Sequence, residues 1–108
     1  MAHSTMRCSG RIYEARDEVI ANIVAKFGRY ARQMNIHWLS EASKEWAEHC
    51  EIMPPGAKVI EFDRWLSGDQ ERQEIMAAID FVAAETQDPK VLHLMHLDDL
   101  KACLQSPR

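Results

Sequence analysis

The chain has 108 residues, 46% of them hydrophobic and 28% charged, which is typical of one globular domain and excludes low-complexity disorder. No stretch approaches about 18 consecutive apolar residues, and residues 1–10 contain no apolar signal core, so the sequence predicts neither a membrane contact nor a secretory signal. The net charge of −4 divides into +3 on residues 1–35 and −7 on residues 36–108, an asymmetry that can steer a protein partner or orient two copies of the chain.

The first predicted element is a long helix. Residues 1–10 lack hydrophobic periodicity, and we expect them to form a flexible tail before a single helical domain over residues 11–108. Over residues 12–34 the apolar side chains fall in one stripe about 140° wide at the helical step of 100° per residue. Such a helix would be roughly 35 Å long.

A second helix is predicted from a cap at Asn35 or Ser40 to about Glu51, where Pro54-Pro55-Gly56 ends it. The following stretch, residues 58–66, is ambiguous. It fits a short strand, but no second convincing strand is available to pair with it, so we favour an irregular segment with one or two helical turns.

The rest of the chain predicts two or three more helices. A third helix is expected from about Gln70 to Thr86, and Asp88-Pro89 is a strong start signal for the next one. Read as one helix, residues 90–104 are apolar on all sides, so we expect a break near Leu97; a strand over residues 91–97 is the alternative. The predicted fold class is therefore all-α, a small bundle of four to five helices with a long N-terminal helix.

The sequence shows no motif of a catalytic or metal site. His93 and His96 are one helical turn apart and Cys103 follows two turns later, but zinc needs about four convergent ligands and no HExxH or paired-cysteine spacing is present. Neither a GxSxG nucleophile motif nor a glycine-rich phosphate loop occurs. We expect no enzyme activity, no metal and no cofactor, and we interpret the odd set of Cys8, Cys50 and Cys103 as free thiols in the cytoplasm.

DNA binding is the main alternative function. Residues 30–46 superficially resemble a helix-turn-helix, yet Glu41 and Lys44 occupy positions that this motif keeps apolar. The second helix also presents several carboxylates, which oppose contact with phosphates. The sequence therefore favours no direct nucleic-acid contact.

Two sets of apolar residues are candidates for protein contacts. The stripe of the first helix is either the core of one chain or the seam of a homodimer, and both readings stay open. Three further residues do not fit a simple core: Phe81 lies off the stripe of the third helix, Trp65 follows a loop, and Leu94 is left over. Tryptophan, tyrosine and methionine side chains are enriched at interface centres. The candidate dimer residues are Ile20, Ile23, Phe27, Tyr30 and Met34, and the candidate partner-binding residues are Phe81, Trp65 and Leu94.

The chain also shows a similarity to known proteins over most of its length, which rests on IYEARDEVIANIVAKFGRYARQM (residues 12–34) and NIHWLSEASKEWAEHCEIMPPG (residues 35–56). On these segments, its length and the lack of a catalytic motif, it resembles the small helical anti-activators of quorum sensing from Pseudomonas. The resemblance implies a cytoplasmic homodimer that binds the ligand-binding domain of a LuxR-type transcription factor such as LasR. It implies no individual functional residue. We therefore expect negative regulation of transcription by protein–protein interaction, with a small DNA-binding regulator as the alternative.

Overall fold

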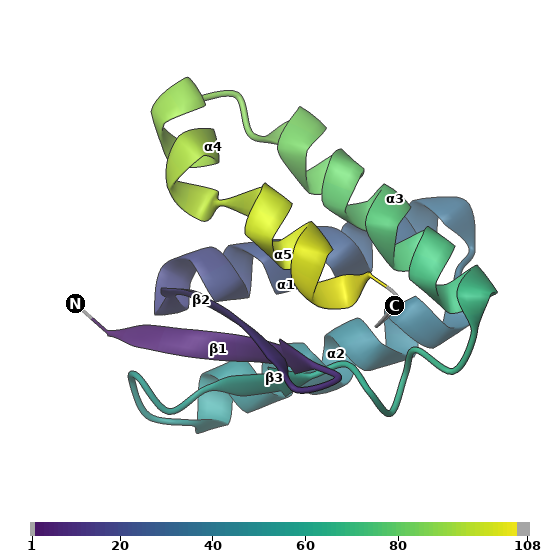
Figure 1. The fold of residues 1–108 in the computed structure, drawn as a ribbon, viewed down its shortest axis with the longest axis horizontal. Helices are drawn as coiled ribbons and strands as arrows, with labels where there is room; N and C mark the ends of the chain where they lie inside the picture. The colour runs from purple at the N-terminus through teal and green to yellow at the C-terminus, as the bar shows by residue number, and fades with distance from the viewer. Residues whose placement is uncertain (1, 106–108) are drawn as a thin grey trace.

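A computed structural model describes residues 2–105, and it is a mixed α/β fold in which a three-stranded sheet packs against helices (Figure 1). The prediction of an all-α bundle is therefore wrong. Met1 of the expected tail and residues 106–108 of the expected helical domain lie outside the described residues.

The sheet begins with a hairpin that replaces both the expected tail and the start of the expected first helix. Strands β1 (His3–Cys8) and β2 (Arg11–Arg16) pair antiparallel around the two-residue turn Ser9-Gly10. Both turn residues have positive φ, 52° and 80°, which gives the twist that two-residue hairpins prefer. Alternate residues of each strand are buried, so the pattern has the period of a strand rather than of a helix.

The third strand, β3 (Val59–Glu61), runs parallel to β1, so the strand order is β2-β1-β3. The Thr5 N–H donates to the Lys58 carbonyl at 3.1 Å, and the Phe62 N–H donates to the Arg7 carbonyl at 3.0 Å. The strand that we considered and set aside for residues 58–66 thus exists, because β1 supplies the partner that the sequence reading lacked.

Helices make up the rest of the described chain, and most of their predicted positions are confirmed. The start signal at Asp88 is confirmed, since its side chain accepts a hydrogen bond from the Lys90 N–H at 2.9 Å. The break in the last segment lies at His96, whose φ is 49°, and residues 91–95 are helical rather than extended. The helices are α1 (Asp17–Met34), α2 (His37–Ile52), α3 (Asp69–Glu85), α4 (Pro89–Met95) and α5 (Leu97–Leu104).

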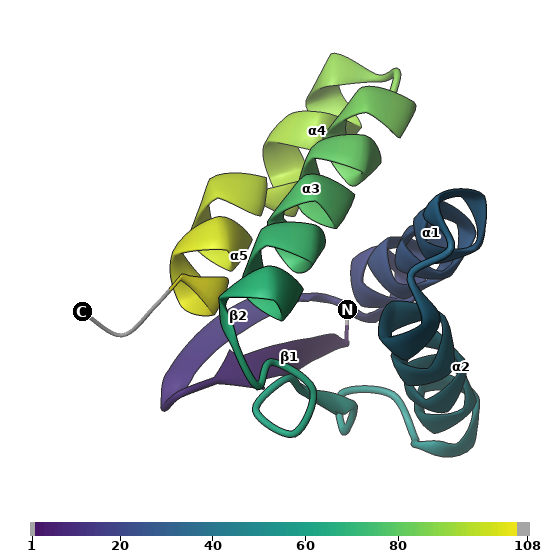
Figure 2. The same ribbon diagram turned by 90° about the vertical axis from the view of Figure 1, so that its right-hand side faces the viewer.

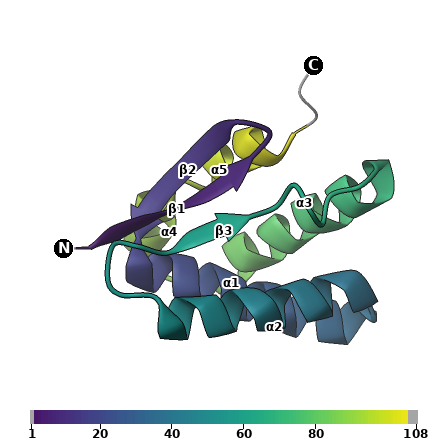
Figure 3. The same cartoon turned by 90° about the horizontal axis from the view of Figure 1, so that it is seen from below.

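The core lies between the sheet and the helices. Helices α1 and α5 contact β1 and β2, α3 packs on α1 and α5, and α2 packs along α1 (Figure 2). Helices α1 and α2 lie side by side and run in opposite directions (Figure 3), whereas the helices of a helix-turn-helix cross at about 90–120°. Among residues 2–105, no helix is both long enough and apolar enough to span a membrane.

A buried polar cluster ties β1 to the start of α1 and to the segment before β3. The Asp17 carboxylate accepts hydrogen bonds from Ser4 Oγ at 2.6 Å and from the Gly56 N–H at 3.0 Å. Lys58 Nζ donates to Asp17 Oδ2, which also accepts from the Gly56 N–H, at 3.0 Å, and to the Met53 carbonyl at 3.2 Å. These hydrogen bonds, that of Ser4 first, lower the pKa of Asp17 to about 2. The cluster therefore fixes the junction where β2 ends and α1 begins.

Candidate functional site

Strand β2 has an edge with no neighbouring strand. The backbone N–H of Thr5 and C=O of Arg7 bond to the β3 segment. The backbone groups of the alternate residues of β1 therefore bond to β2, where their partners are Arg11, Tyr13 and Ala15. The alternate residues Ile12 and Glu14 consequently point their backbone N–H and C=O groups away from the sheet. Within residues 2–105 no hydrogen bond satisfies these groups. An unpaired edge of this kind is a template for pairing with another chain.

Two hollows lie beside this edge. One, of about 500 Å³, is bordered by Tyr13, Glu14 and the α5 residues Asp99 and Ala102. The second, of about 650 Å³, is bordered by the end of β2, the first turns of α1 and one side of α4. His96 borders both hollows. We refer to the β2 edge and these two hollows together as the β2 groove.

Exposed apolar side chains gather around the β2 groove. Ile12 is 61% exposed, Leu94 55% and Val91 40%, and all three border one of the two hollows. Val19 and Met95 add half-buried and buried apolar surface to the second hollow. A cluster of large apolar side chains left in water marks a surface that gains free energy when another molecule covers it.

Three acidic and two basic side chains border the groove: Glu14, Glu18 and Asp99, with Arg11 and Arg16. The Arg11 guanidinium donates to the Ala102 carbonyl at 2.7 Å, and Arg16 lies 3.7 Å from the carboxylate of Glu18. No ion pair within residues 2–105 involves Glu14 or Asp99. The groove thus offers two carboxylates without an ion pair, on β2 and α5, next to an Arg11 guanidinium that bonds to a neutral carbonyl.

Tyr13 connects the floor of the groove to α4. Its hydroxyl donates to the Met95 carbonyl at the end of α4, which joins β2 to the helices. Burial, with the nearby charge of Asp99, raises the pKa of Tyr13 to about 12, so the phenol stays protonated and able to donate. The Cys103 thiol donates to the Arg11 carbonyl at 3.5 Å and stabilises the other end of β2.

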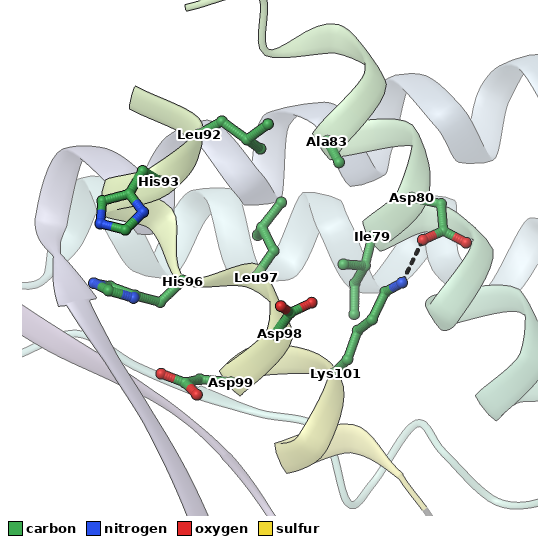
Figure 4. A pocket seen from close by; sticks show the side chains of 10 residues that line it. All are labelled: Ile79, Asp80, Ala83, Leu92, His93, His96, Leu97, Asp98, Asp99 and Lys101. Carbon is green, nitrogen blue, oxygen red and sulfur yellow. Dashed lines mark ion pairs between the residues drawn. The ribbon is translucent and has the colours of Figure 1, made fainter. Parts of the chain in front are cut away.

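A further pocket on the opposite side of α5 contains the two histidines considered as metal ligands (Figure 4). The rings of His93 and His96 lie on the same side with centroids 5.7 Å apart, and the ion pair of Asp80 with Lys101 closes the far end. Over residues 2–105, no three His, Cys, Asp or Glu side chains are placed to hold a metal ion.

Burial disfavours the thiolate form of two of the three cysteines, Cys50 and Cys103. Cys8, Cys50 and Cys103 are all free, and burial raises the pKa of the Cys50 and Cys103 thiols. A nucleophilic cysteine requires the opposite shift, because the thiolate is the reactive form. These residues are packing residues in this fold.

The three candidate partner-binding residues do not share one pocket. Leu94 lies in the β2 groove. Phe81 is half-buried between α3 and α1, where its ring centroid is 5.3 Å from that of Tyr30. Trp65 is half-buried, with its ring centroid 6.4 Å from that of Trp46. Phe81 and Trp65 thus also make internal contacts, and partner binding by any of the three residues stays a prediction.

The candidate dimer residues lie mostly inside one chain. Ile20, Ile23 and Phe27 are 0% exposed, because α2, α3 and the sheet cover this face of α1. Tyr30 is half-buried and Met34 is 58% exposed at the end of the helix. The stripe is therefore the core of the monomer, and three of the five residues cannot form a seam in this fold. Homodimerisation itself stays a prediction.

Sequence reasoning missed Ile12, Glu14 and Val91. The available signal was the turn dipeptide Ser9-Gly10, which separates the two six-residue segments that form β1 and β2. In comparisons with known proteins, no family model, no curated protein and no solved structure matches the chain.

Proposed function

We propose that this protein is a regulator that acts by binding another protein through the β2 groove. The observation that supports this most directly is the free edge of β2 beside the exposed side chains of Ile12, Val91 and Leu94. Such an arrangement combines backbone hydrogen-bonding groups with apolar surface, the two features that peptide-binding domains use for affinity and specificity.

The partner that the resemblance implies is the ligand-binding domain of a LuxR-type transcription factor such as LasR. In this proposal the protein occupies the surface with which that factor dimerises and so prevents DNA binding, in the cytoplasm and as a negative regulator of transcription. No cofactor or catalytic step takes part. The alternative, direct DNA binding, is disfavoured by the net charge of −4 and by the free carboxylates at the groove.

The experiment is a titration of the purified chain with the ligand-binding domain of LasR, followed by calorimetry. We expect Leu94→Glu to weaken binding at least about thirtyfold, because it places a charge at an apolar contact. Ile52→Glu is the matched control, since Ile52 is 78% exposed at the end of α2, away from the groove. It should bind as the wild type does.

Two results would contradict the proposal. One is the absence of binding at concentrations up to about 100 μM. The other is equal binding of wild type and Leu94→Glu, which would place the contact elsewhere. A salt-dependent shift of specific DNA by the protein alone would instead support the DNA-binding alternative.

A further inference from the structure

We infer that the occupant of the β2 groove is an extended segment of the partner that adds to the sheet as a strand beside β2 and places a lysine or arginine against Glu14 and Asp99. This inference rests on the proposed function and specifies the chemistry that the groove recognises. It follows from the backbone of β2, from the shape of its surroundings and from the charges beside it.

The backbone of β2 is arranged for strand addition. Ile12 and Glu14 each offer an N–H and a C=O to the solvent side, and Arg16 adds a further N–H at the end of the strand. The six residues of β2 span roughly 20 Å at about 3.3 Å per residue. A partner segment of similar length satisfies all of these groups at once, whereas a helix laid in the groove leaves them unpaired.

The opposite edge of the sheet, formed by β3, is less available for pairing with another strand than the β2 edge. Strand β3 has only three residues, and its Val59 N–H, which points away from β1, already donates to His49 Nε2 at 3.0 Å. Short strands and edges covered by a side chain are the usual protections against unwanted pairing. Within residues 2–105, the long unprotected edge is therefore that of β2.

The two hollows determine which side chains the added strand has. Successive side chains of a strand point to opposite faces, so every second residue of the segment would face the helices. There it meets Val19, Leu94 and Met95, a surface that takes aliphatic side chains. The remaining residues lie on the outer face of the sheet, next to Ile12 and Glu14.

Charge complementarity selects a basic residue within this apolar pattern. Glu14 lies on the outer face of β2, and Asp99 lies at the first hollow. Neither carboxylate has an ion pair within residues 2–105; Arg16 pairs with Glu18, while Arg11 bonds only to the neutral Ala102 carbonyl, so acidic groups still outnumber basic ones at the groove. A lysine or arginine in the segment neutralises these carboxylates, while an acidic segment is repelled.

The probe for this inference is an acetylated peptide of about seven residues in which valine and lysine alternate, with binding followed by fluorescence anisotropy. Two N-methylated versions separate strand pairing from simple charge attraction. In one, the methyl groups replace the N–H groups that face β2; in the other, they replace those that face away. We expect the first to lose binding at least about tenfold and the second to bind as the parent does.

Two variants of the protein test the same contact. Glu14→Pro removes an N–H that has no partner within the described chain, so we expect the variant to fold and its peptide binding to fall about tenfold. Glu14→Lys keeps the N–H but reverses the charge at this position. It should therefore bind a peptide in which valine and glutamate alternate more tightly than the one with valine and lysine. The melting temperature of each variant reports whether the fold is intact. Should Glu14→Pro not fold, the methylated peptides and Glu14→Lys decide the question.

The outcomes distinguish this inference from the proposed function. Equal binding of both methylated peptides, or no effect of Glu14→Lys on charge preference, overturns strand addition. If LasR binding is lost in Leu94→Glu but unchanged in Glu14→Pro, the groove binds the partner and the strand inference is wrong. If the peptide binds in the expected register and the LasR domain does not, the proposed partner is wrong and the strand inference is supported. A dimer in sedimentation experiments that Glu14→Pro converts into a monomer would place a second copy at the β2 edge and overturn it.

Discussion

The cluster around Asp17 gives the sharpest prediction about stability. We expect Asp17→Ala to destabilise the protein strongly, because it removes the acceptor of hydrogen bonds from Ser4 Oγ, the Gly56 N–H and Lys58 Nζ. The substitution also leaves the Lys58 side chain, 11% exposed, without its counter-ion. Since Asp17 follows directly after β2, the loss loosens the junction that holds the groove.

The magnitude follows from the pKa of Asp17. A pKa lowered from 3.8 to about 2 corresponds to about 2 kcal/mol of favourable interaction of the charged form. Removing one partner of a largely buried ion pair adds the cost of the charge left behind, so we expect a loss of about 3 kcal/mol in the free energy of unfolding. For a domain of this size that corresponds to a fall of about 15 °C in melting temperature.

The assay is denaturation followed by circular dichroism, with Glu18→Ala as the control. Glu18 is 74% exposed and its contact with Arg16 measures 3.7 Å, so its loss should cost less than about 0.5 kcal/mol. The pKa of Asp17 is lowered, so its contribution is complete above about pH 4 and lost as the pH falls towards 2. The difference in the free energy of unfolding between wild type and Asp17→Ala should therefore decrease as the pH falls from about 4 towards 2. The reasoning would be refuted if Asp17→Ala lowered the melting temperature by less than about 4 °C at pH 7, or if the stability difference from wild type did not depend on pH.

Three further predictions concern Tyr13, the core of α1 and the hairpin turn. Tyr13→Phe should cost about 1 to 3 kcal/mol by leaving the Met95 carbonyl unpaired, measured by urea denaturation. Because the pKa of Tyr13 is raised to about 12, its contribution is complete below about pH 10 and lost as the pH rises towards 12; an absorbance titration should show one tyrosine that ionises late. Ile23→Glu should unfold the chain rather than yield a folded monomer, since Ile23 is 0% exposed, and a native circular dichroism spectrum would contradict this. Gly10→Ala should cost about 1 kcal/mol because φ is 80° there, although no atom obstructs a Cβ; unchanged stability would mean that the turn adopts another conformation.

The helices could be predicted from the sequence because a helix that buries one face places its apolar residues at the 3.6-residue helical period. Asp88-Pro89 marked the start of α4, and the expected third helix coincides with α3 to within one residue at each end. The stripe over residues 12–34 was misleading at its beginning. Ile12 and Tyr13 fall in phase with the helix by coincidence, while in the strand they point to opposite faces.

The sheet could not be predicted from any one segment. Strand β1 has polar residues such as Ser4 at a buried position, where the hydrogen bond to Asp17 compensates for burial. Strand β3 is too short to be recognised without the strand beside it. The candidate site was found only in part for the same reason. Leu94 could be singled out as a residue without a core role, but the unpaired edge at Ile12 and Glu14 can be recognised only when the strand pairing is known.

The most direct test of the account is the hydrogen exchange of the β2 amides, measured by NMR in the free protein and with the ligand-binding domain of LasR. In the free protein the amides of Tyr13 and Ala15, which bond to β1, should exchange slowly, and those of Ile12 and Glu14 rapidly. On binding, the account predicts that exchange at Ile12 and Glu14 slows at least about tenfold. Binding that leaves these two amides as fast as in the free protein would contradict the claim that the β2 groove is the binding site.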